Sequence, residues 1–180
     1  MSRPPLARER VLDAFEAILV EGGERTATLE ATAKSAGVSK GGLLYHFASK
    51  DDLAAGMITR LERLVEADLE EMAAASEGPV AYYIRTSVME NEPLDRALIA
   101  VSRLAQGGSP SAVRALRDTR RSWGEAIRPH VRDETALDLV LLVSDGLYFN
   151  NSLDAQGLEP LVPRDAELRA LVDLVTRAAT

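Results

Sequence analysis

Cysteine is absent from the 180 residues of this chain, and histidine occurs only twice. The lack of cysteine excludes disulfides, thiolate zinc sites and cysteine nucleophiles. The two histidines, His46 and His130, are far apart in the sequence, and we find no serine–histidine–acid set, paired histidine ligands or glycine-rich phosphate loop. We therefore expect no enzyme activity, no metal site and no cofactor.

Aromatic residues make up only 4% of the chain, whereas hydrophobic residues make up 46% and alanine, leucine and arginine are abundant. This composition favours helices over sheets. No apolar run is long enough to cross a bilayer, and residues 1–10 lack the apolar core of a signal peptide. We expect an all-α, soluble, cytoplasmic protein that has no membrane partner.

Acidic residues exceed basic ones, which gives a formal net charge of −7. Residues 1–50 carry seven Lys and Arg against six Asp and Glu, whereas residues 51–180 carry fourteen against twenty-two. The acidity therefore belongs to the second part, which would repel nucleic acid from the wrong face. The near-neutral first part predicts modest non-specific affinity for DNA, because that affinity scales with the phosphates neutralised.

Residues 28–50 predict two short helices joined by a tight turn, followed by the start of a longer helix. Thr28 is a suitable N-cap for the first helix, and Gly37 is placed to end it in a left-handed conformation. Ser39 can cap a second helix that runs to His46. A helix, a glycine-containing turn and a second helix form the layout of a helix-turn-helix DNA reader.

Two further features favour DNA binding. Gly41 and Gly42 occupy the first turn of the second helix, where each costs about 1 kcal/mol relative to alanine, and a close approach to phosphate or a base edge would explain them. All three lysines of the chain, Lys34, Lys40 and Lys50, lie in this stretch, and lysine suits phosphate oxygens. A small helical hairpin with a solvated face is the alternative interpretation.

The segment AGVSKGGLLYHFASKDDL (residues 36–53) resembles the DNA-binding signature of the tetracycline-repressor (TetR) family of bacterial transcriptional regulators. Family members are helical homodimers with an N-terminal DNA-binding domain and a C-terminal ligand-binding domain, and most release their operator when a small molecule binds. By position, the resemblance implies that these residues face DNA: Thr28, Ser39, Lys40, Gly42, Leu44, Tyr45, His46 and Lys50. Gly41, in the first turn of the same helix, is predicted to face DNA as well. Leu44 departs from the aromatic residue common in the family, and it cannot donate a hydroxyl group to phosphate.

Outside the reader segment (residues 28–46), the sequence predicts one helix before it and six helices after it. The domains predicted are residues 1–49, a three-helix DNA-binding domain, and residues 50–180, a helical ligand-binding and dimerisation domain. A long helix that begins near Lys50 joins them. The helices outside the reader segment are expected at residues 7–20, 50–75, 80–89, 93–106, 110–128, 134–153 and 164–178.

The last two helices are expected to form a homodimer interface. The helix at residues 134–153 is apolar almost all round, so it must be buried on more than one side. Two such antiparallel helix pairs would form a four-helix interface about a two-fold axis; closure of a monomeric core is the alternative. The residues predicted for the interface are Leu137, Leu141, Leu168, Leu171, Val172 and Val175.

A ligand site is expected in the second domain, where polar residues interrupt apolar helices. Asp145 and Tyr148 lie one turn apart and could converge in an apolar pocket. Alternatively, Asp145 pairs with Arg120 or Arg121 across the dimer. The predicted pocket residues are Met57, Leu61, Leu104, Trp123, Ile127, Asp145, Tyr148 and Phe149.

We therefore expect a homodimeric transcriptional regulator that binds a palindromic, double-stranded DNA operator and is released by an unknown small-molecule effector. The alternative is a helical DNA-binding protein with no small-molecule switch, whose second domain binds a protein partner. A deep apolar cavity in the second domain would distinguish the two. A helical enzyme would need a clustered acid and base, which the sequence does not contain.

Overall fold

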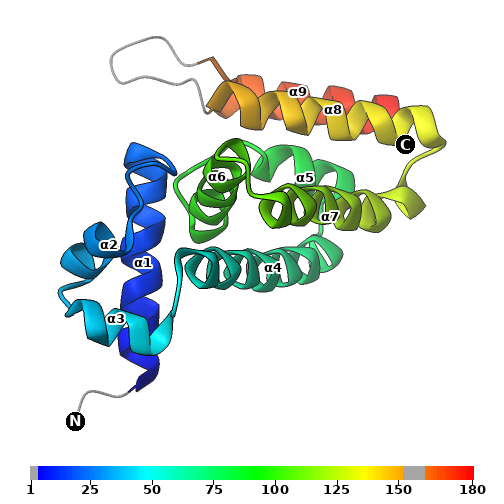
Figure 1. The fold of residues 1–180 in the computed structure, drawn as a ribbon. Helices are drawn as coiled ribbons and strands as arrows, with labels where there is room; N and C mark the ends of the chain where they lie inside the picture. The colour runs from blue at the N-terminus through cyan, green and yellow to red at the C-terminus, as the bar shows by residue number, and fades with distance from the viewer. Residues whose placement is uncertain (1–3, 152–160) are drawn as a thin grey trace. The chain divides into compact units, whose positions relative to one another are not determined.

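The computed structural model describes residues 4–151 and 161–180, and these residues form nine α-helices, one short 3-10 helix and no strand (Figure 1). The all-α prediction is confirmed. The helices are α1 (Pro4–Gly22), α2 (Leu29–Ala36), α3 (Lys40–His46), α4 (Lys50–Ala74), α5 (Pro79–Thr86), α6 (Pro93–Gln106), α7 (Pro110–Ile127), α8 (Glu134–Asn151) and α9 (Asp165–Ala179), with the 3-10 helix η1 (Arg128–His130) before α8.

The chain divides by packing into two units that are interleaved in the sequence. The first unit contains Met1–Val65 and Asn91–Thr119, and the second contains Glu66–Glu90 and Arg120–Thr180. Both α4 and α7 contribute residues to each unit. The predicted domains, residues 1–49 and 50–180, are consecutive in the sequence and differ in kind from these interleaved packing units. The domain boundary between residues 49 and 50 therefore stays a prediction.

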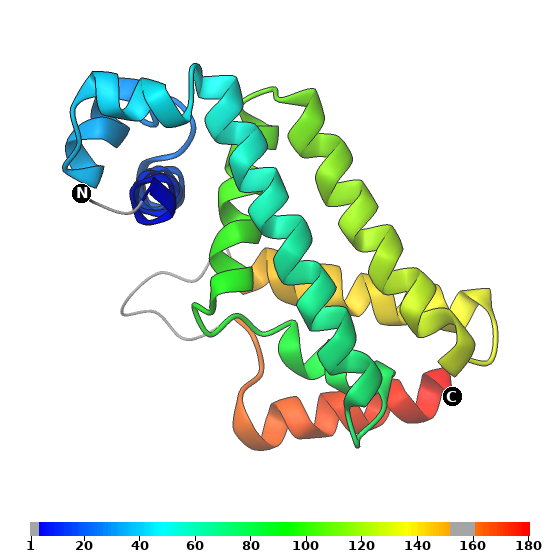
Figure 2. The same ribbon diagram turned by 90° about the horizontal axis from the view of Figure 1, so that it is seen from below.

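The first unit holds the three helices predicted for DNA binding. Both α2 and α3 pack on α1, and α1 also packs on α6; Figure 2 looks along α1, with α2 and α3 beside it. Val11, Leu12, Phe15 and Leu19 of α1 are almost completely buried. Burial of each such side chain stabilises the fold by about 1.5–3 kcal/mol, so the predicted apolar stripe of α1 is the core of this unit.

The second unit is built around α5, α8 and α9, because α5 packs on both other helices and α8 packs on α9. The helices α8 and α9 run antiparallel (Figure 1). The amide of Arg132, just before α8, donates to the carbonyl oxygen of Ala179 at the end of α9 at 2.9 Å. This hydrogen bond fixes the register of the antiparallel pair.

Most helix boundaries lie close to the prediction, and the exceptions have local causes. The first helix begins at Pro4 rather than near residue 7, because proline is tolerated in the first turn of a helix. The helix α5 ends at Thr86, where the hydroxyl of Ser87 donates to the carbonyl oxygen of Tyr83 at 2.6 Å. The last two residues expected in the helix at 134–153 lie outside the described residues.

Candidate nucleic-acid interface

The turn between α2 and α3 is built by the capping residues that the sequence predicts. The Thr28 hydroxyl accepts a hydrogen bond from the Ala31 amide at 3.1 Å, and the Ser39 hydroxyl accepts one from the Gly42 amide at 3.0 Å. Gly37 ends α2 with φ 65° and ψ 35°, a left-handed conformation that glycine adopts without strain. Both helix ends are therefore fixed locally, and the relative placement of α2 and α3 follows from this turn.

The helix α3 is anchored by one side chain and presents the others to solvent. Leu43 is completely buried, whereas Tyr45 is 82% exposed and Leu44 is 38% exposed. An alanine methyl group at Gly41 would meet no atom within 4 Å, so this edge of the first turn is open. The rings of Tyr45 and His46 meet edge to face, with centroids 5.1 Å apart. The exposed face of α3 thus carries an aromatic group, an aliphatic group and backbone without side chains.

The two lysines assigned to DNA each contact a glutamate. The Lys40 ammonium lies 2.5 Å from Oε1 of Glu30, and this hydrogen bond holds the pKa of Glu30 below its usual value. The Lys50 ammonium donates to Oε1 of Glu24 at 2.6 Å and to the Glu24 carbonyl oxygen at 2.8 Å. A phosphate would therefore have to compete with a carboxylate for each ammonium group. Neither glutamate could be identified from the sequence, because they lie 10 and 26 residues from their partners.

A cluster of ion pairs holds α1 against α4 in the same unit. The Arg60 guanidinium lies 2.8 Å from Glu9, 2.8 Å from Asp13 and 3.2 Å from Glu16. Glu16 also pairs with Arg96 of α6 at 3.0 Å. Burial lowers the pKa of Arg60, but the hydrogen bonds to Glu9 and Glu16 and the charge and hydrogen bond of Asp13 together raise it by more. One buried carboxylate therefore connects three helices of the unit.

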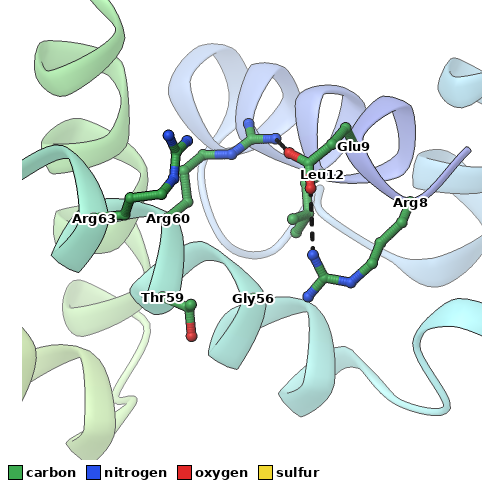
Figure 3. Close-up of a pocket in the computed structure, with 7 residues that line it drawn as sticks. All are labelled: Arg8, Glu9, Leu12, Gly56, Thr59, Arg60 and Arg63. Atoms are coloured by element: carbon green, nitrogen blue, oxygen red, sulfur yellow. Dashed lines mark hydrogen bonds and ion pairs between the residues drawn. The ribbon is translucent and has the colours of Figure 1, made fainter. Parts of the chain in front are cut away.

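A small cavity of about 160 Å³ lies beside this cluster, between α1 and α4 (Figure 3). Its lining residues are Arg8, Glu9, Leu12, Gly56, Thr59, Arg60 and Arg63. The guanidinium groups of Arg8 and Arg60 both turn toward Glu9 (Figure 3). Gly56 permits the close approach of the two helices, because a methyl group there would lie 2.9 Å from Leu12 and 3.0 Å from Phe47.

The residues predicted to line a ligand pocket fall into both packing units. Within the first unit, Met57, Leu61 and Leu104 are buried core residues. Within the second unit, Trp123 and Ile127 are buried, whereas Phe149 is 64% exposed. The Trp123 ring lies 6.5 Å from the ring of Tyr148, centroid to centroid, so this predicted pair is brought together.

Asp145 pairs with an arginine of its own chain. The Arg120 guanidinium lies 2.8 Å from Oδ2 of Asp145, and the same hydrogen-bonded contact raises the pKa of Arg120. The alternative interpretation paired Asp145 with Arg120 across a dimer, and the pair forms within one chain instead. The charge of Asp145 is therefore compensated before any ligand binds.

The residues predicted for the dimer interface divide into buried and partly exposed groups. Leu137, Leu141 and Val175 are at most 5% exposed within a single chain, whereas Leu168, Leu171 and Val172 remain partly exposed. The most exposed apolar residues of the same helices are not among the predicted interface residues: Leu139, Leu142 and Phe149 on α8, and Leu174 on α9. Helical spacing gives the signal, because Leu139, Leu142 and Phe149 lie three and seven residues apart.

Neither a metal site nor a membrane-spanning helix is found within the described parts of the chain. No group of three or more His, Asp or Glu side chains there could hold a metal ion. No helix among those residues is long and apolar enough to cross a membrane.

Two family models match the sequence. The model described as bacterial regulatory proteins, tetR family, matches residues 11–57, which include the α2–turn–α3 segment. The model described as a tetracyclin repressor-like C-terminal domain matches residues 77–177. A comparison with curated protein sequences found no match.

Solved structures share the fold across nearly the whole chain. A transcriptional regulator from Rhodococcus is 23% identical with a TM-score of 0.72, over 96% of this chain and 95% of that one. The multidrug binding protein EbrR, complexed with malachite green, is 18% identical with a TM-score of 0.70, over 96% and 98%. The ketosteroid transcriptional regulator KstR2 of Mycobacterium tuberculosis is 17% identical with a TM-score of 0.63, over 96% and 94%.

Proposed function

This chain belongs to the TetR family of bacterial regulatory proteins, and from that premise we propose that it is a homodimeric repressor. It binds a palindromic operator through α3 and releases it when a small molecule binds. In this proposal residues 1–49 act as the DNA-binding domain and residues 50–180 as the ligand-binding and dimerisation domain. The protein acts on DNA in the cytoplasm.

The observation that carries the proposal is the exposed face of α3. Tyr45 and Leu44 are exposed on a helix whose first turn, at Gly41 and Gly42, carries no side chain beyond hydrogen. A bare and capped N-terminus lets backbone amides approach phosphate, while an apolar side chain can contact a thymine methyl group. Lys40 and Lys50 would then exchange their glutamate partners for phosphate oxygens.

The exposed apolar side chains of α8 and α9 support a homodimer. Leu142 and Phe149 are each 64% exposed, and Leu174 is 57% exposed. Large apolar side chains exposed on two helices that pack together, α8 and α9, indicate an interaction site, and a second copy of the chain offers the same residues in return. A two-fold dimer of this kind presents two reader helices in inverted orientation, and it therefore favours an operator that is an inverted repeat.

Release by a ligand follows from a shift between two populations of the dimer. A small molecule that binds better to the conformation with separated reader helices lowers operator affinity, by no more than its differential affinity for the two states. The relative EbrR is described as a multidrug binding protein complexed with malachite green, which supports a small organic effector. The helix α4, like α7, contributes residues to both packing units, and its Arg60 pairs with carboxylates of α1. It is therefore the segment through which binding would reach α1.

The test is selection of bound fragments from random double-stranded DNA, with full-length protein at near-physiological salt. We expect an inverted repeat whose half-sites are spaced by about one helical turn or a multiple of it. The Tyr45→Ala variant should fail to enrich this sequence, because it removes the most exposed side chain of α3. Recovery of a direct repeat would contradict two-fold docking, and sequence-blind binding alone would overturn operator recognition.

A further inference from the structure

The cavity between α1 and α4 is lined by three guanidinium groups and one carboxylate (Figure 3). Its α4 residues, Gly56, Thr59, Arg60 and Arg63, recur at spacings of three and four and therefore share one face of the helix. The side chains of Arg60 and Arg63 leave α4 on the same side (Figure 3). All lining residues belong to the first packing unit, so the cavity is complete within that unit.

The guanidinium groups at the cavity outnumber the carboxylate that serves them. Among the described residues, no carboxylate forms an ion pair with Arg63. Arg8 pairs with the adjacent Glu9 at 3.3 Å, through side chains that are 45% and 50% exposed, and exposed pairs of this kind are weak. Glu9 also lies 2.8 Å from Arg60. Of the three arginines, Arg63 is therefore uncompensated and Arg8 is only weakly held.

Carboxylates outside the cavity do not remove this positive excess. Arg60 also contacts Asp13 at 2.8 Å and Glu16 at 3.2 Å, and Glu16 is shared with Arg96 at 3.0 Å. With these residues included, four arginines face three carboxylates, in a chain whose net charge is −7. The contacts of Arg60 use Nη1 and Nη2, so within the described ranges its Nε–H remains available as a donor.

The size and lining of the cavity restrict what can occupy it. Its volume is about 160 Å³, whereas pockets for drug-sized ligands usually enclose about 300–1,000 Å³. Leu12 supplies the one apolar side chain among the lining residues, so a hydrophobic ligand would find little contact. A small oxyanion fits both limits, because the planar fork of arginine matches the paired oxygens of phosphate or carboxylate.

The position of the cavity separates it from the surface assigned to DNA. Arg63 lies about 20 Å beyond Lys50 along α4, at 1.5 Å per residue. A backbone phosphate held at Lys50 would therefore not fill the cavity. The occupant is instead a free anion small enough to enter between the two helices.

We propose that Arg8, Arg60 and Arg63 form a binding site for a small dianionic oxyanion of the phosphate class. The anion accepts hydrogen bonds from Arg63 of α4 and Arg8 of α1, and Glu9 keeps its pair with Arg60. Because the anion joins the two helices, it stabilises the first unit. The inference goes beyond the proposed function and is independent of it, since the site requires neither DNA nor a second copy of the chain.

The first experiment is calorimetric titration of the full-length protein with inorganic phosphate, in a chloride buffer of constant ionic strength. We expect one phosphate per chain, and binding at least fivefold tighter than that of acetate, which carries a single charge. Glycerol 2-phosphate distinguishes the source of the anion: tighter binding than phosphate indicates a phosphate monoester, and weaker binding indicates the free ion. Absence of saturable binding by both phosphates, or equal binding of acetate, would overturn the proposal.

The second experiment removes the uncompensated charge. Arg63→Gln should weaken phosphate binding at least tenfold, because it removes a charge-assisted pair of hydrogen bonds. Arg63 is exposed, so this variant leaves the core intact. The matched control is Arg114→Gln, at another exposed arginine of the same unit for which no ion pair is found among the described residues, and it should change the affinity less than twofold. Undiminished binding by Arg63→Gln would refute the assignment.

Thermal melting tests whether the anion joins the helices. Phosphate stabilises many proteins without binding to a site, so the measured quantity is the difference between variants in the same pair of phosphate and chloride buffers. At ten times the dissociation constant, phosphate should raise the melting temperature of the parent and of Arg114→Gln by about 3–6 °C more than that of Arg63→Gln. Equal rises in all three proteins would contradict a stabilising site between α1 and α4.

Discussion

Replacement of Arg60 by methionine is expected to lower the free energy of unfolding by about 2–3 kcal/mol, a loss set by burial. The Arg60 side chain is only 10% exposed, and the side chain of its partner Glu16 is 7% exposed. Methionine retains the apolar stem of arginine and removes the charge, so the change isolates the ion pairs.

The magnitude follows from the separate contacts. Removal of one partner from a buried ion pair costs about 3–5 kcal/mol, because the other charge is left uncompensated. Here Arg96 remains 3.0 Å from Glu16 and still compensates part of its charge, so the cost falls below the lower end of that range. The contacts with Glu9 and Asp13 involve side chains that are 50% and 65% exposed, and such pairs contribute about 0–1 kcal/mol each.

The assay is urea unfolding followed by the helical circular dichroism signal, with thermal melting as a second measurement. A chain of this length loses about 2–4 °C of melting temperature for each kcal/mol, so Arg60→Met should melt about 4–12 °C lower. The control is Arg63→Met, on the same helix at an exposed position for which no ion pair is found among the described residues. Equal losses in the two variants would refute the reasoning from buried charge.

Four further changes test other contacts. Glu24→Gln should tighten non-specific DNA binding about two- to fivefold in a titration at fixed salt, because it frees the Lys50 ammonium at the cost of one partly exposed pair. Gly56→Ala should lower the free energy of unfolding by about 1–3 kcal/mol in urea, because the added methyl group overlaps two fixed side chains. Leu142→Arg should produce monomers in sedimentation velocity, because it places charge on an exposed apolar face. Asp68→Asn should gain stability relative to the parent as the pH rises from 4 to 7 in urea titrations, because burial raises the pKa of this carboxyl and so penalises its ionised form in the folded state.

Matched variants decide these outcomes. Glu21→Gln is the control for Glu24→Gln: it removes a negative charge nearby and should leave DNA affinity within twofold. An equal gain in affinity by both variants would point to net charge alone. Gly41→Ala meets open space and should gain up to about 1 kcal/mol while it weakens DNA binding. Val113→Arg is the control for Leu142→Arg, because it also adds charge at an exposed apolar residue. Dissociation of the dimer by both variants would argue against a specific interface. Asp145→Asn removes a carboxylate that is paired with Arg120, and it is the matched control for the charge removed by Asp68→Asn.

The reader segment could be predicted from the sequence because its signals are local. Thr28, Gly37 and Ser39 act through atoms within a few residues of themselves, so each cap could be assigned without knowledge of the tertiary fold. The boundaries of α6 matched the prediction for the same reason, because Pro93 and Gly107 flank the helix in sequence.

Contacts between distant residues could not be predicted in this way. Glu24 reaches Lys50 only because the loop after α1 returns to the start of α4, and nothing in the sequence encodes that return locally. Asp68, which accepts hydrogen bonds from Tyr82 and Trp123, did carry a signal that was overlooked. It lies on the apolar stripe of the long helix, three residues after Val65 and four before Met72, and a carboxylate at that position is a polar interruption of a buried face.

Under the proposed function, the pairing of Lys40 and Lys50 with glutamates has a consequence for how many molecules a cell would need. Every chromosome offers a vast excess of non-cognate sites that compete with an operator for a DNA-binding protein. An ammonium group that must first leave a carboxylate gains less free energy from an arbitrary phosphate. Binding of the protein to non-cognate DNA is therefore weaker. A larger share of the pool then stays free to search, and occupancy of one operator is reached with a lower copy number.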